Sequence, residues 1–248
     1  MTRLFMEEVE AGSGSITLGS DDSRYISQVL RMRPGEQLKV VLKDGIEALC
    51  EVDTLDKNEV TLKVIETREN TSEPPFNITL YQSVSKGERM ELTIQKCVEL
   101  GVTKIVPVFS LRCVVRPDEP KKQKSKVERW QKIALEAARQ SGRGVIPEVT
   151  EPKLFAQAVK DAKASSDVVL MPWEEERAVT LKQALSELSK DSIREVAVFI
   201  GPEGGYDESE AKTARDEGAI PVTIGERILR TETAGAAVLA MFLYEFEL

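Results

Sequence analysis

Hydrophobic and polar residues alternate with period two between about residues 36 and 66. Three alternating runs are separated by two polar turns, in the order 38–42, 43–45, 46–52, 56–58 and 60–64. The first turn, Lys43-Asp44-Gly45, contains Asp-Gly, which between alternating runs is typical of a β-hairpin. The pattern therefore predicts a small all-β unit over residues 1 to about 70, and a barrel is one form that such a unit can take.

The pattern changes after Asn70–Pro75, a polar stretch with two consecutive prolines that neither a helix nor an inner strand tolerates easily. Beyond it, short apolar runs alternate with amphipathic segments. The predicted strands are 77–84, 104–109, 168–171, 196–200 and 221–224, and the longer predicted helices are 90–98, 122–141 and 232–246. This alternation predicts an α/β domain with a mostly parallel sheet. We therefore divide the chain into domains 1–72 and 73–248.

Composition excludes several kinds of chemistry. The 248 residues contain no histidine, which rules out Ser-His-Asp and Cys-His catalysis and His-ligated zinc. Cys50, Cys97 and Cys113 form no C-x-x-C motif, and Cys97 falls on the apolar face of the helix predicted at 90–98. The N-terminus becomes acidic too early for a signal peptide, and no apolar run reaches the ~18 residues of a membrane span. We expect a cytoplasmic protein without a metal site.

A glycine-rich loop follows the predicted strand 196–200. Gly201-Pro202-Glu203-Gly204-Gly205 places three glycines around one carboxylate, more than a plain strand-to-helix turn requires. Asp207 and Glu210 then have the spacing of a helix capping box. Ligands of open α/β sheets bind at the carboxyl ends of strands, so this loop is a candidate binding site. It matches neither the P-loop motif nor the dinucleotide fingerprint.

A second polar loop precedes the final helix. It begins with Ile224-Gly225-Glu226, and Arg227 and Arg230 then flank Ile228-Leu229. Arg230, Thr231 and Glu232 are predicted near the N-terminus of that helix, where unpaired amides favour anions. Core packing explains the small residues that follow, but not two arginines beside a glycine.

Four motifs along the chain, in this order, together resemble one known family: Lys86–Glu91 with Gln95–Lys96 and Glu99–Val102, Glu136–Arg143, Gly201–Gly205, and Arg227–Ala234. They closely resemble the RsmE family of ribosomal RNA small-subunit methyltransferases, in the SPOUT superfamily. The resemblance spans the whole chain. It implies a PUA-like β-barrel in front of an α/β domain whose C-terminal segment forms a trefoil knot, an exception to the general absence of knots.

The resemblance also implies an activity. It predicts a homodimer that uses S-adenosylmethionine (SAM) to methylate N3 of one uridine in 16S rRNA, either naked or in the assembled small subunit. The implied cofactor-binding residues come from three loops: Leu170, Met171, Pro172, Gly201, Pro202, Glu203, Gly204, Gly205, Ile224, Gly225, Arg227, Ile228, Leu229 and Arg230. Glu226 and Arg139 depart from the usual family pattern, which bears on RNA contacts rather than on the glycines.

The sequence suggests how the reaction proceeds without a histidine. SAM carries an activated methyl group, so positioning and electrostatics contribute most of the catalysis. Arg230 is expected to stabilise negative charge on the uracil oxygens, with help from amides near Thr231. Glu232 or Glu203 accepts the N3 proton if burial raises its pKa, and a hydroxide route is equally open.

Charge is unevenly distributed along the chain. The total is −8, yet residues 112–143 contain ten basic and four acidic residues, a net charge of +6, which leaves −14 for the remainder. A helix over 122–141 places Val127, Trp130, Ala134 and Ala137 on one side and most of the basic residues on the other. A basic face of this kind favours phosphate binding over an ordinary solvated helix face. The expected RNA-binding residues are Lys122, Lys126, Arg129, Arg139, Gln140 and Arg143, with Arg3, Arg24 and Arg31 added by analogy with the family.

Two other classes of function stay open. One is an RNA-binding ribosome assembly factor whose glycine loops hold no cofactor. The other is a SPOUT enzyme that methylates a ribose 2′-oxygen or another base. Ribose enzymes of the superfamily usually have an asparagine-bearing S-L-N-V-S-like segment where this chain has Arg230–Ala234, which disfavours ribose chemistry.

Overall fold

The computed structural model describes residues 3–6, 8–10, 12–56, 59–116, 119–190 and 192–247. Lys57 and Asn58 of the predicted second turn lie outside these ranges. So does Asp118 of the basic segment. No helix in the described ranges is long and apolar enough to span a bilayer.

The chain forms two compact units. The first comprises Met1–Glu73 together with Arg139–Val145. The second comprises Pro74–Ala138 together with Ile146–Leu248. The sequence predicted a contiguous division between residues 72 and 73, whereas the first unit also takes in a short segment from the middle of the chain.

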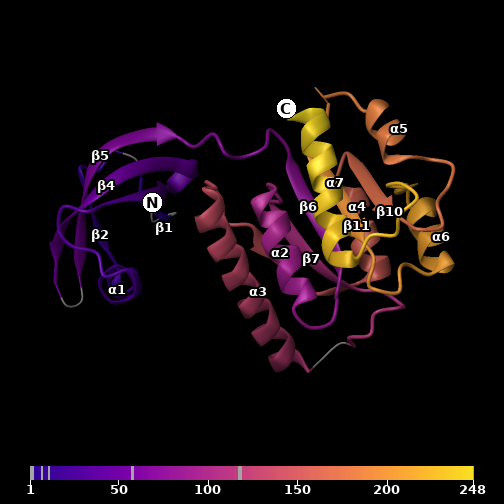
Figure 1. Ribbon diagram of the computed structural model, residues 1–248, viewed down its shortest axis with the longest axis horizontal. Coiled ribbons are helices and arrows are strands. Elements are labelled where there is room, and N and C mark those ends of the chain that lie inside the picture. The colour runs from indigo at the N-terminus through magenta and orange to yellow at the C-terminus, as the bar shows by residue number, and fades with distance from the viewer. Residues whose placement is uncertain are drawn as a thin grey trace. The chain divides into compact units, whose positions relative to one another are not determined.

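The first unit is built on one five-stranded sheet (Figure 1). Its elements, in chain order, are β1 (Arg3–Met6), β2 (Ser15–Leu18), α1 (Ser20–Arg24), the π-helical turn η1 (Tyr25–Val29), β3 (Gln37–Leu42), the 3-10 turn η2 (Lys43–Gly45), β4 (Ile46–Leu55) and β5 (Val60–Glu69). The strand order is β1-β3-β4-β5-β2. β1 runs parallel to β3, and the other pairs are antiparallel. Among the described residues, β1 and β2 are the two edges of the sheet.

Period-two alternation explains the core of this unit. Leu38, Val40 and Leu42 are all buried. The antiparallel register places Leu38 opposite Cys50 and Val40 opposite Ala48, so apolar side chains from both strands share one face. The predicted hairpin is confirmed, with its turn at η2.

The second unit is built on a seven-stranded parallel sheet. Its strands are β6 (Asn77–Ser83), β7 (Lys104–Phe109), β8 (Glu148–Val149), β9 (Lys153–Leu154), β10 (Val168–Pro172), β11 (Glu195–Ile200) and β12 (Ile220–Val222). Its helices are α2 (Arg89–Glu99), α3 (Pro120–Ser141), α4 (Phe155–Ser165), α5 (Leu181–Ser186), α6 (Glu208–Asp216) and α7 (Thr231–Phe246). The part of α3 from Arg139 onward groups with the first unit. The strand order is β12-β10-β11-β6-β7-β8, with β9 also paired to β7. The predicted parallel α/β domain is confirmed.

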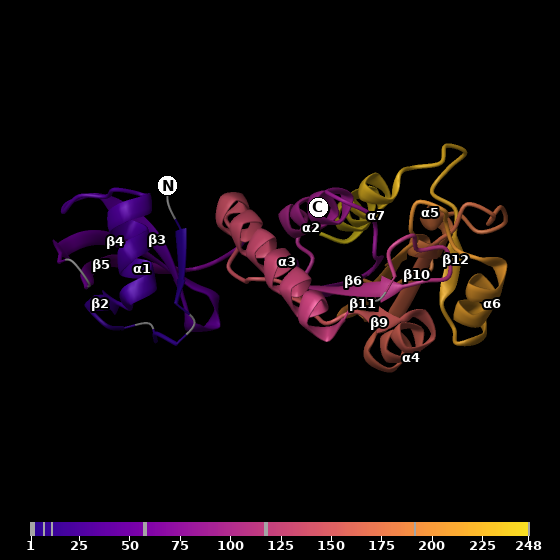
Figure 2. The same cartoon turned by 90° about the horizontal axis from the view of Figure 1, so that it is seen from below.

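Helices cover both faces of this sheet (Figure 2). α4 and α6 lie on one face, where Tyr81 of β6 stacks on Phe199 of β11 with ring centroids 4.4 Å apart. α2 and α7 lie on the other face and pack against each other. At their contact, a Cβ on Gly235 would lie 3.2 Å from the Cys97 sulfur, so a larger residue there would fit only if the two helices moved slightly apart. Cys97 is fully buried, as predicted, and burial raises the pKa of its thiol to about 12.

The sheet brings the two predicted functional loops to one edge. β10, β11 and β12 are parallel, with β10 between the other two. Their carboxyl ends therefore point the same way, and the loops that follow residues 172, 200 and 222 leave from neighbouring strand ends. This geometry places segments more than 50 residues apart in the sequence around one site.

Candidate active site

A cleft of about 560 Å³ lies at the carboxyl ends of β10, β11 and β12. The three loops line it, and the lining includes most of the predicted cofactor residues: Pro172, Gly201, Pro202, Glu203, Gly204, Gly205, Ile224, Gly225, Arg227, Ile228, Leu229 and Arg230. Leu170 and Met171 do not line the cleft. Both are fully buried in β10.

Local capping fixes the end of the glycine loop. The Asp207 carboxylate accepts a hydrogen bond from the Ser209 amide at 3.0 Å, and the Asp207 amide donates to Glu210 at 3.1 Å. This is the predicted capping box at the start of α6. Gly205 adopts a φ of +66°, a left-handed conformation that disfavours other residues, and a Cβ at this position would overlap the Glu174 carboxylate. The loop conformation thus depends on glycine at this position.

Glu203 is held firmly within the loop. Its Oε1 atom accepts hydrogen bonds from the Lys86 amide at 3.0 Å and from Arg89 at 2.9 Å. Burial raises the pKa of Glu203, but these hydrogen bonds outweigh it, and the pKa lies below its usual value. The raised pKa on which its expected role as a base depended is therefore not found. Glu203 acts as an ionised anchor for the loop.

The N-terminus of α7 forms another wall of the cleft. Arg230 is its N-cap residue and has an exposed side chain. The Thr231 hydroxyl donates to the Gly201 carbonyl at 2.7 Å and accepts from Gln82 at 2.9 Å, which ties α7 to the end of β11. The Glu232 side chain is 13% exposed, and its Oε2 atom is buried without a hydrogen-bond partner. Glu232 therefore brings an unsatisfied acceptor to the site.

Four arginines and four glutamates line the cleft, and the arginines differ in how they are paired. Arg177, Arg227 and Arg230 line it, and the structure shows no ion pair for any of them within the ranges it describes. Arg89 also lines it but is paired. No group of three or more Cys, Asp or Glu side chains suited to a metal occurs in the described part of the chain.

The sequence missed several residues that line the cleft. Trp173, Glu174 and Arg177 lie in the loop that begins after Pro172. Extending the predicted cofactor loop beyond Pro172 would have included them. Arg89 was present in a motif of the family resemblance, but nothing local linked it to the glycine loop 114 residues away.

The long helix α3 carries part of the predicted RNA-binding surface. Trp130, Ala134 and Ala137 are buried, which confirms the predicted apolar face. On the polar side, Lys122, Arg129, Lys132 and Gln140 are exposed, whereas Lys126 is half-buried. Arg129 is 67% exposed and pairs with Glu91 of α2 at 2.7 Å.

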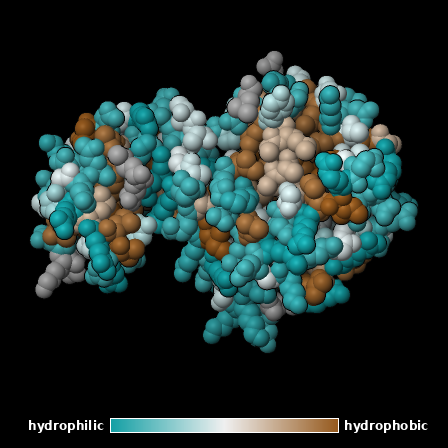
Figure 3. Space-filling view, viewed as in Figure 1, coloured by the Kyte–Doolittle hydropathy of each residue, from teal (hydrophilic) through white to brown (hydrophobic). Residues whose placement is uncertain are grey.

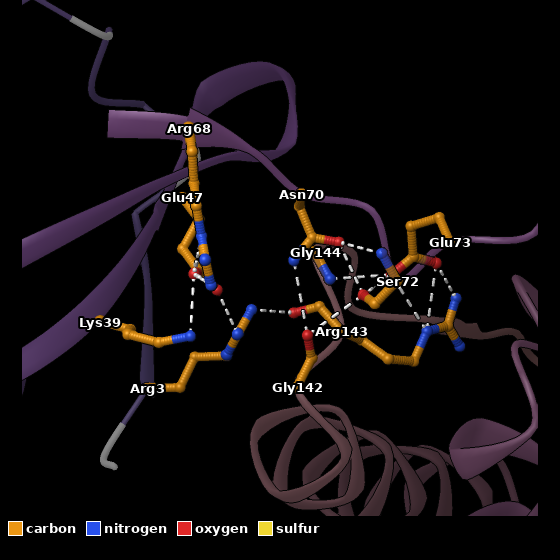
Figure 4. A network of polar contacts seen from close by, with 10 residues as sticks. All are labelled: Arg3, Lys39, Glu47, Arg68, Asn70, Ser72, Glu73, Gly142, Arg143 and Gly144. Atoms are coloured by element: carbon orange, nitrogen blue, oxygen red, sulfur yellow. Dashed lines mark hydrogen bonds and ion pairs between the residues drawn. The ribbon is translucent and has the colours of Figure 1, made fainter. Parts of the chain in front are cut away.

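The predicted RNA contacts of the first unit lie in two environments. Arg3 is buried, pairs with the buried Glu47 and donates to the Arg143 carbonyl at 2.8 Å (Figure 4). Arg143 is only 2% exposed and pairs with Glu73 (Figure 4). Because both guanidinium groups are buried in ion pairs, we correct their assignment and interpret Arg3 and Arg143 as structural residues.

The other candidate residues of the first unit are more accessible. Arg139 is half-buried, with its guanidinium 4.8 Å from the centre of the Tyr25 ring, in a cation–π contact. Arg24 and Arg31 are exposed. They stay predicted RNA contacts.

Known proteins similar to this chain have the same two-part organisation. Residues 72–243 match the family described as RNA methyltransferase domain, and residues 18–65 match the RNA methyltransferase PUA domain. The chain is 35% identical to the ribosomal RNA small subunit methyltransferase E of Bacillus subtilis, covering 100% of this chain and 98% of the relative. It belongs to the ribosomal RNA small subunit methyltransferase E family. The family resemblance of the sequence motifs is thereby confirmed.

Solved structures of the family share the fold. The family member from Neisseria gonorrhoeae, described as bound to S-adenosyl methionine, is 33% identical with a TM-score of 0.86, covering 98% of this chain and 97% of that one. A putative methyltransferase from Legionella pneumophila in complex with SAM is 32% identical with the same TM-score and the same coverage. The predicted α/β fold with a smaller PUA-like N-terminal domain is confirmed, while the trefoil knot stays a prediction.

Proposed function

We propose that this protein transfers the methyl group of SAM to N3 of a specific uridine in the 16S rRNA of the small ribosomal subunit. Family membership makes it a SAM-dependent rRNA methyltransferase, and the uridine and its N3 atom are the finer part of the proposal. The observation that carries it is the glycine-lined cleft, in a chain that matches a SAM-bound family member along its whole length. Because the proposed substrate is ribosomal RNA, we place the protein in the cytoplasm.

The cleft fits the proposed cofactor. Its volume of about 560 Å³ lies within the range of small-molecule sites, about 300–1,000 Å³. Ile200, Ile224 and Leu229 provide apolar lining, and the glycine loop exposes backbone near a ligand. SAM supplies a methyl group on a sulfonium, so the residues of the cleft need only bind and orient the reactants.

The N-terminus of α7 has groups that suit the acceptor base. Uridine N3 carries a proton that has to leave before N3 is a good nucleophile. We assign Glu232 as the acceptor of that proton, because its buried Oε2 atom has no other partner. The amides of Thr233 and Ala234 bond to the Arg230 carbonyl, which leaves the first amides of the helix for an anion. The unbonded first amides of α7 and the Arg230 guanidinium stabilise the negative charge that develops on the uracil oxygens.

Exposed basic side chains outside the cleft, together with one glutamine, provide the proposed RNA contacts. Lys122, Arg129, Lys132 and Gln140 share the polar side of α3, and Arg24 and Arg31 lie in the first unit. These groups carry no sequence information by themselves, since phosphate contacts position RNA without reading its bases.

We also propose a homodimer through α7. Most residues of this helix are apolar, and two of them, Met241 and Tyr244, are 44% and 74% exposed. Leu92 on the neighbouring α2 is 42% exposed. Figure 3 shows brown and pale-brown side chains gathered over α7. Exposed apolar surface of this kind is typical of a protein interface.

Labelled SAM tests the reaction and its substrate together. The protein is incubated with assembled small subunits and with naked 16S rRNA, and the labelled nucleoside is identified by mass spectrometry. We expect 3-methyluridine at one position. A different methylated base would refute the N3 assignment and favour another SPOUT reaction. Absence of heat on titration with SAM would instead favour an RNA-binding assembly factor.

A further inference from the structure

Arg89 lies where two walls of the cleft meet. It is the first residue of α2 and lines the cleft itself. Its NH1 atom is 2.9 Å from Glu203 Oε1 in the glycine loop, and its Nε atom is 4.0 Å from Glu232 Oε1 in the first turn of α7. One guanidinium therefore faces carboxylates from two different walls.

Charge balance distinguishes Arg89 from the other arginines of the cleft. Arg177, Arg227 and Arg230 show no ion pairs in the described segments, so their charges are available to an anionic ligand. Arg89 is faced by two carboxylates, which already compensate its single positive charge. Its interactions are thus directed at groups of the protein rather than at a ligand.

The contacts of Glu203 show what Arg89 holds in place. The two donors to Glu203, the Lys86 amide and the Arg89 side chain, both come from the short connection between β6 and α2 and the first residue of that helix. The loop that carries Glu203 has three glycines and so has many alternative conformations. The charge-assisted hydrogen bonds that Glu203 accepts from the Lys86 amide and from Arg89, the first residue of α2, restrict the loop to one of them.

We propose that Arg89 is a positioning residue that holds the Gly201–Gly205 loop in its ligand-binding conformation and keeps Glu232 beside it. The proposal rests on the proposed function, in that the ligand of the loop is SAM. Arg89 acts through Glu203, so the two residues form one unit. When Arg89 is replaced, the loop is free to move before SAM binds. The conformational entropy lost on ordering the loop then opposes SAM binding.

The test compares Arg89→Gln, Arg89→Lys, Glu203→Gln and the double variant Arg89→Gln/Glu203→Gln in the full-length protein. SAM affinity is measured by calorimetry, and kcat and KM for SAM are measured with small subunits. Arg194→Gln is the matched control, because Arg194 is an exposed arginine just before β11, at the end of the sheet opposite the cleft. Circular dichroism checks that each variant is folded, and Glu203→Gln tests the same anchor if Arg89→Gln does not fold.

We expect Arg89→Gln to weaken SAM binding and raise KM about tenfold, while kcat at saturating SAM falls less than about threefold. Arg89→Lys keeps the charge and regains most of the affinity. The double variant binds SAM within about twofold of the weaker single variant, because both substitutions break one anchor. Unchanged affinity in Arg89→Gln, or losses that multiply in the double variant, would overturn the proposal. A wild-type protein that neither binds SAM nor methylates RNA would instead refute the proposed function.

Discussion

Arg143 offers a sharp test of the distinction between RNA-binding and structural arginines. It lies just beyond the C-terminus of α3, in the segment Arg139–Val145 that groups with the first unit. Its Nε atom is 3.1 Å from Glu73 Oε2, and the Gly144 amide donates to the other Glu73 oxygen at 2.8 Å. Its carbonyl accepts from Arg3 at 2.8 Å (Figure 4). Substitution by methionine keeps the apolar stem and removes the guanidinium.

The stability that Arg143→Met is expected to lose follows from the burial of the ion pair. Arg143 is 2% exposed and Glu73 is 23% exposed. Removing one partner of a buried ion pair costs about 3–5 kcal/mol, because the other charge stays buried without compensation. Glu73 keeps some water and the Gly144 amide, so we expect the lower end, about 3 kcal/mol. For a unit of about 80 residues this lowers the unfolding midpoint by on the order of 15 °C.

Calorimetry and fluorescence together measure this effect. Both tryptophans, Trp130 and Trp173, lie in the second unit, so their fluorescence follows that unit, whereas calorimetry follows both. The matched control is Arg129→Met, which removes a 67%-exposed arginine and should cost less than about 1 kcal/mol. An Arg143→Met midpoint within 2 °C of the wild type, with a weaker salt dependence of RNA binding, would refute the structural assignment and restore Arg143 as an RNA contact.

Four further predictions concern the site, the RNA surface, the first unit and the dimer. Arg230→Ala should lower kcat by roughly a hundredfold, as for one oxyanion-stabilising donor, with little change in SAM affinity by calorimetry; equal losses would make Arg230 mainly a cofactor residue. Lys122→Gln with Lys132→Gln should reduce the slope of log affinity against log salt by up to about two, measured by filter binding. Hydrogen bonds from Lys39 and Arg68 outweigh burial and lower the pKa of Glu47 in the folded protein. The stability that Glu47 contributes is therefore fully present above its unfolded pKa of about 4.5 and should be lost as the pH falls through the lower folded pKa. When the free energy of unfolding is measured against pH, its loss in acid should be shallower in Glu47→Gln than in the wild type. Tyr244→Glu should give a monomer in sedimentation analysis, whereas an unchanged mass would contradict the α7 interface.

Local pattern was sufficient for much of the architecture. The segments predicted at 77–84, 104–109 and 196–200 correspond to β6, β7 and β11. For β7 and β11 the signal was a nearly continuous apolar run, as expected of a strand buried on both faces. The Asp207–Glu210 capping box was also predictable, since its two partners are three residues apart. The glycine loop was predicted as a site from its composition, and the cleft does lie there.

Side-chain environments could not be predicted in the same way. Glu203 was a candidate proton acceptor on the condition that burial raised its pKa, but hydrogen bonds from the Lys86 amide and from Arg89, which lies 114 residues away, outweigh burial and lower that pKa. Arg3 and Arg143 looked like exposed cations by composition and family analogy, yet they meet each other and the carboxylates Glu47 and Glu73 inside the first unit. No periodicity in the sequence marks such pairs.

The sequence by itself determined the two kinds of architecture, the positions of the main elements and the family. The physical reason is that period, capping and glycine content act over a few residues and decide which faces are buried. The tertiary structure alone decided which charged groups are paired and which stay available. Whether a charge is compensated depends on neighbours within about 4 Å, and these come from distant parts of the chain. Of the four arginines in the cleft, one is therefore an anchor and three remain available to ligands.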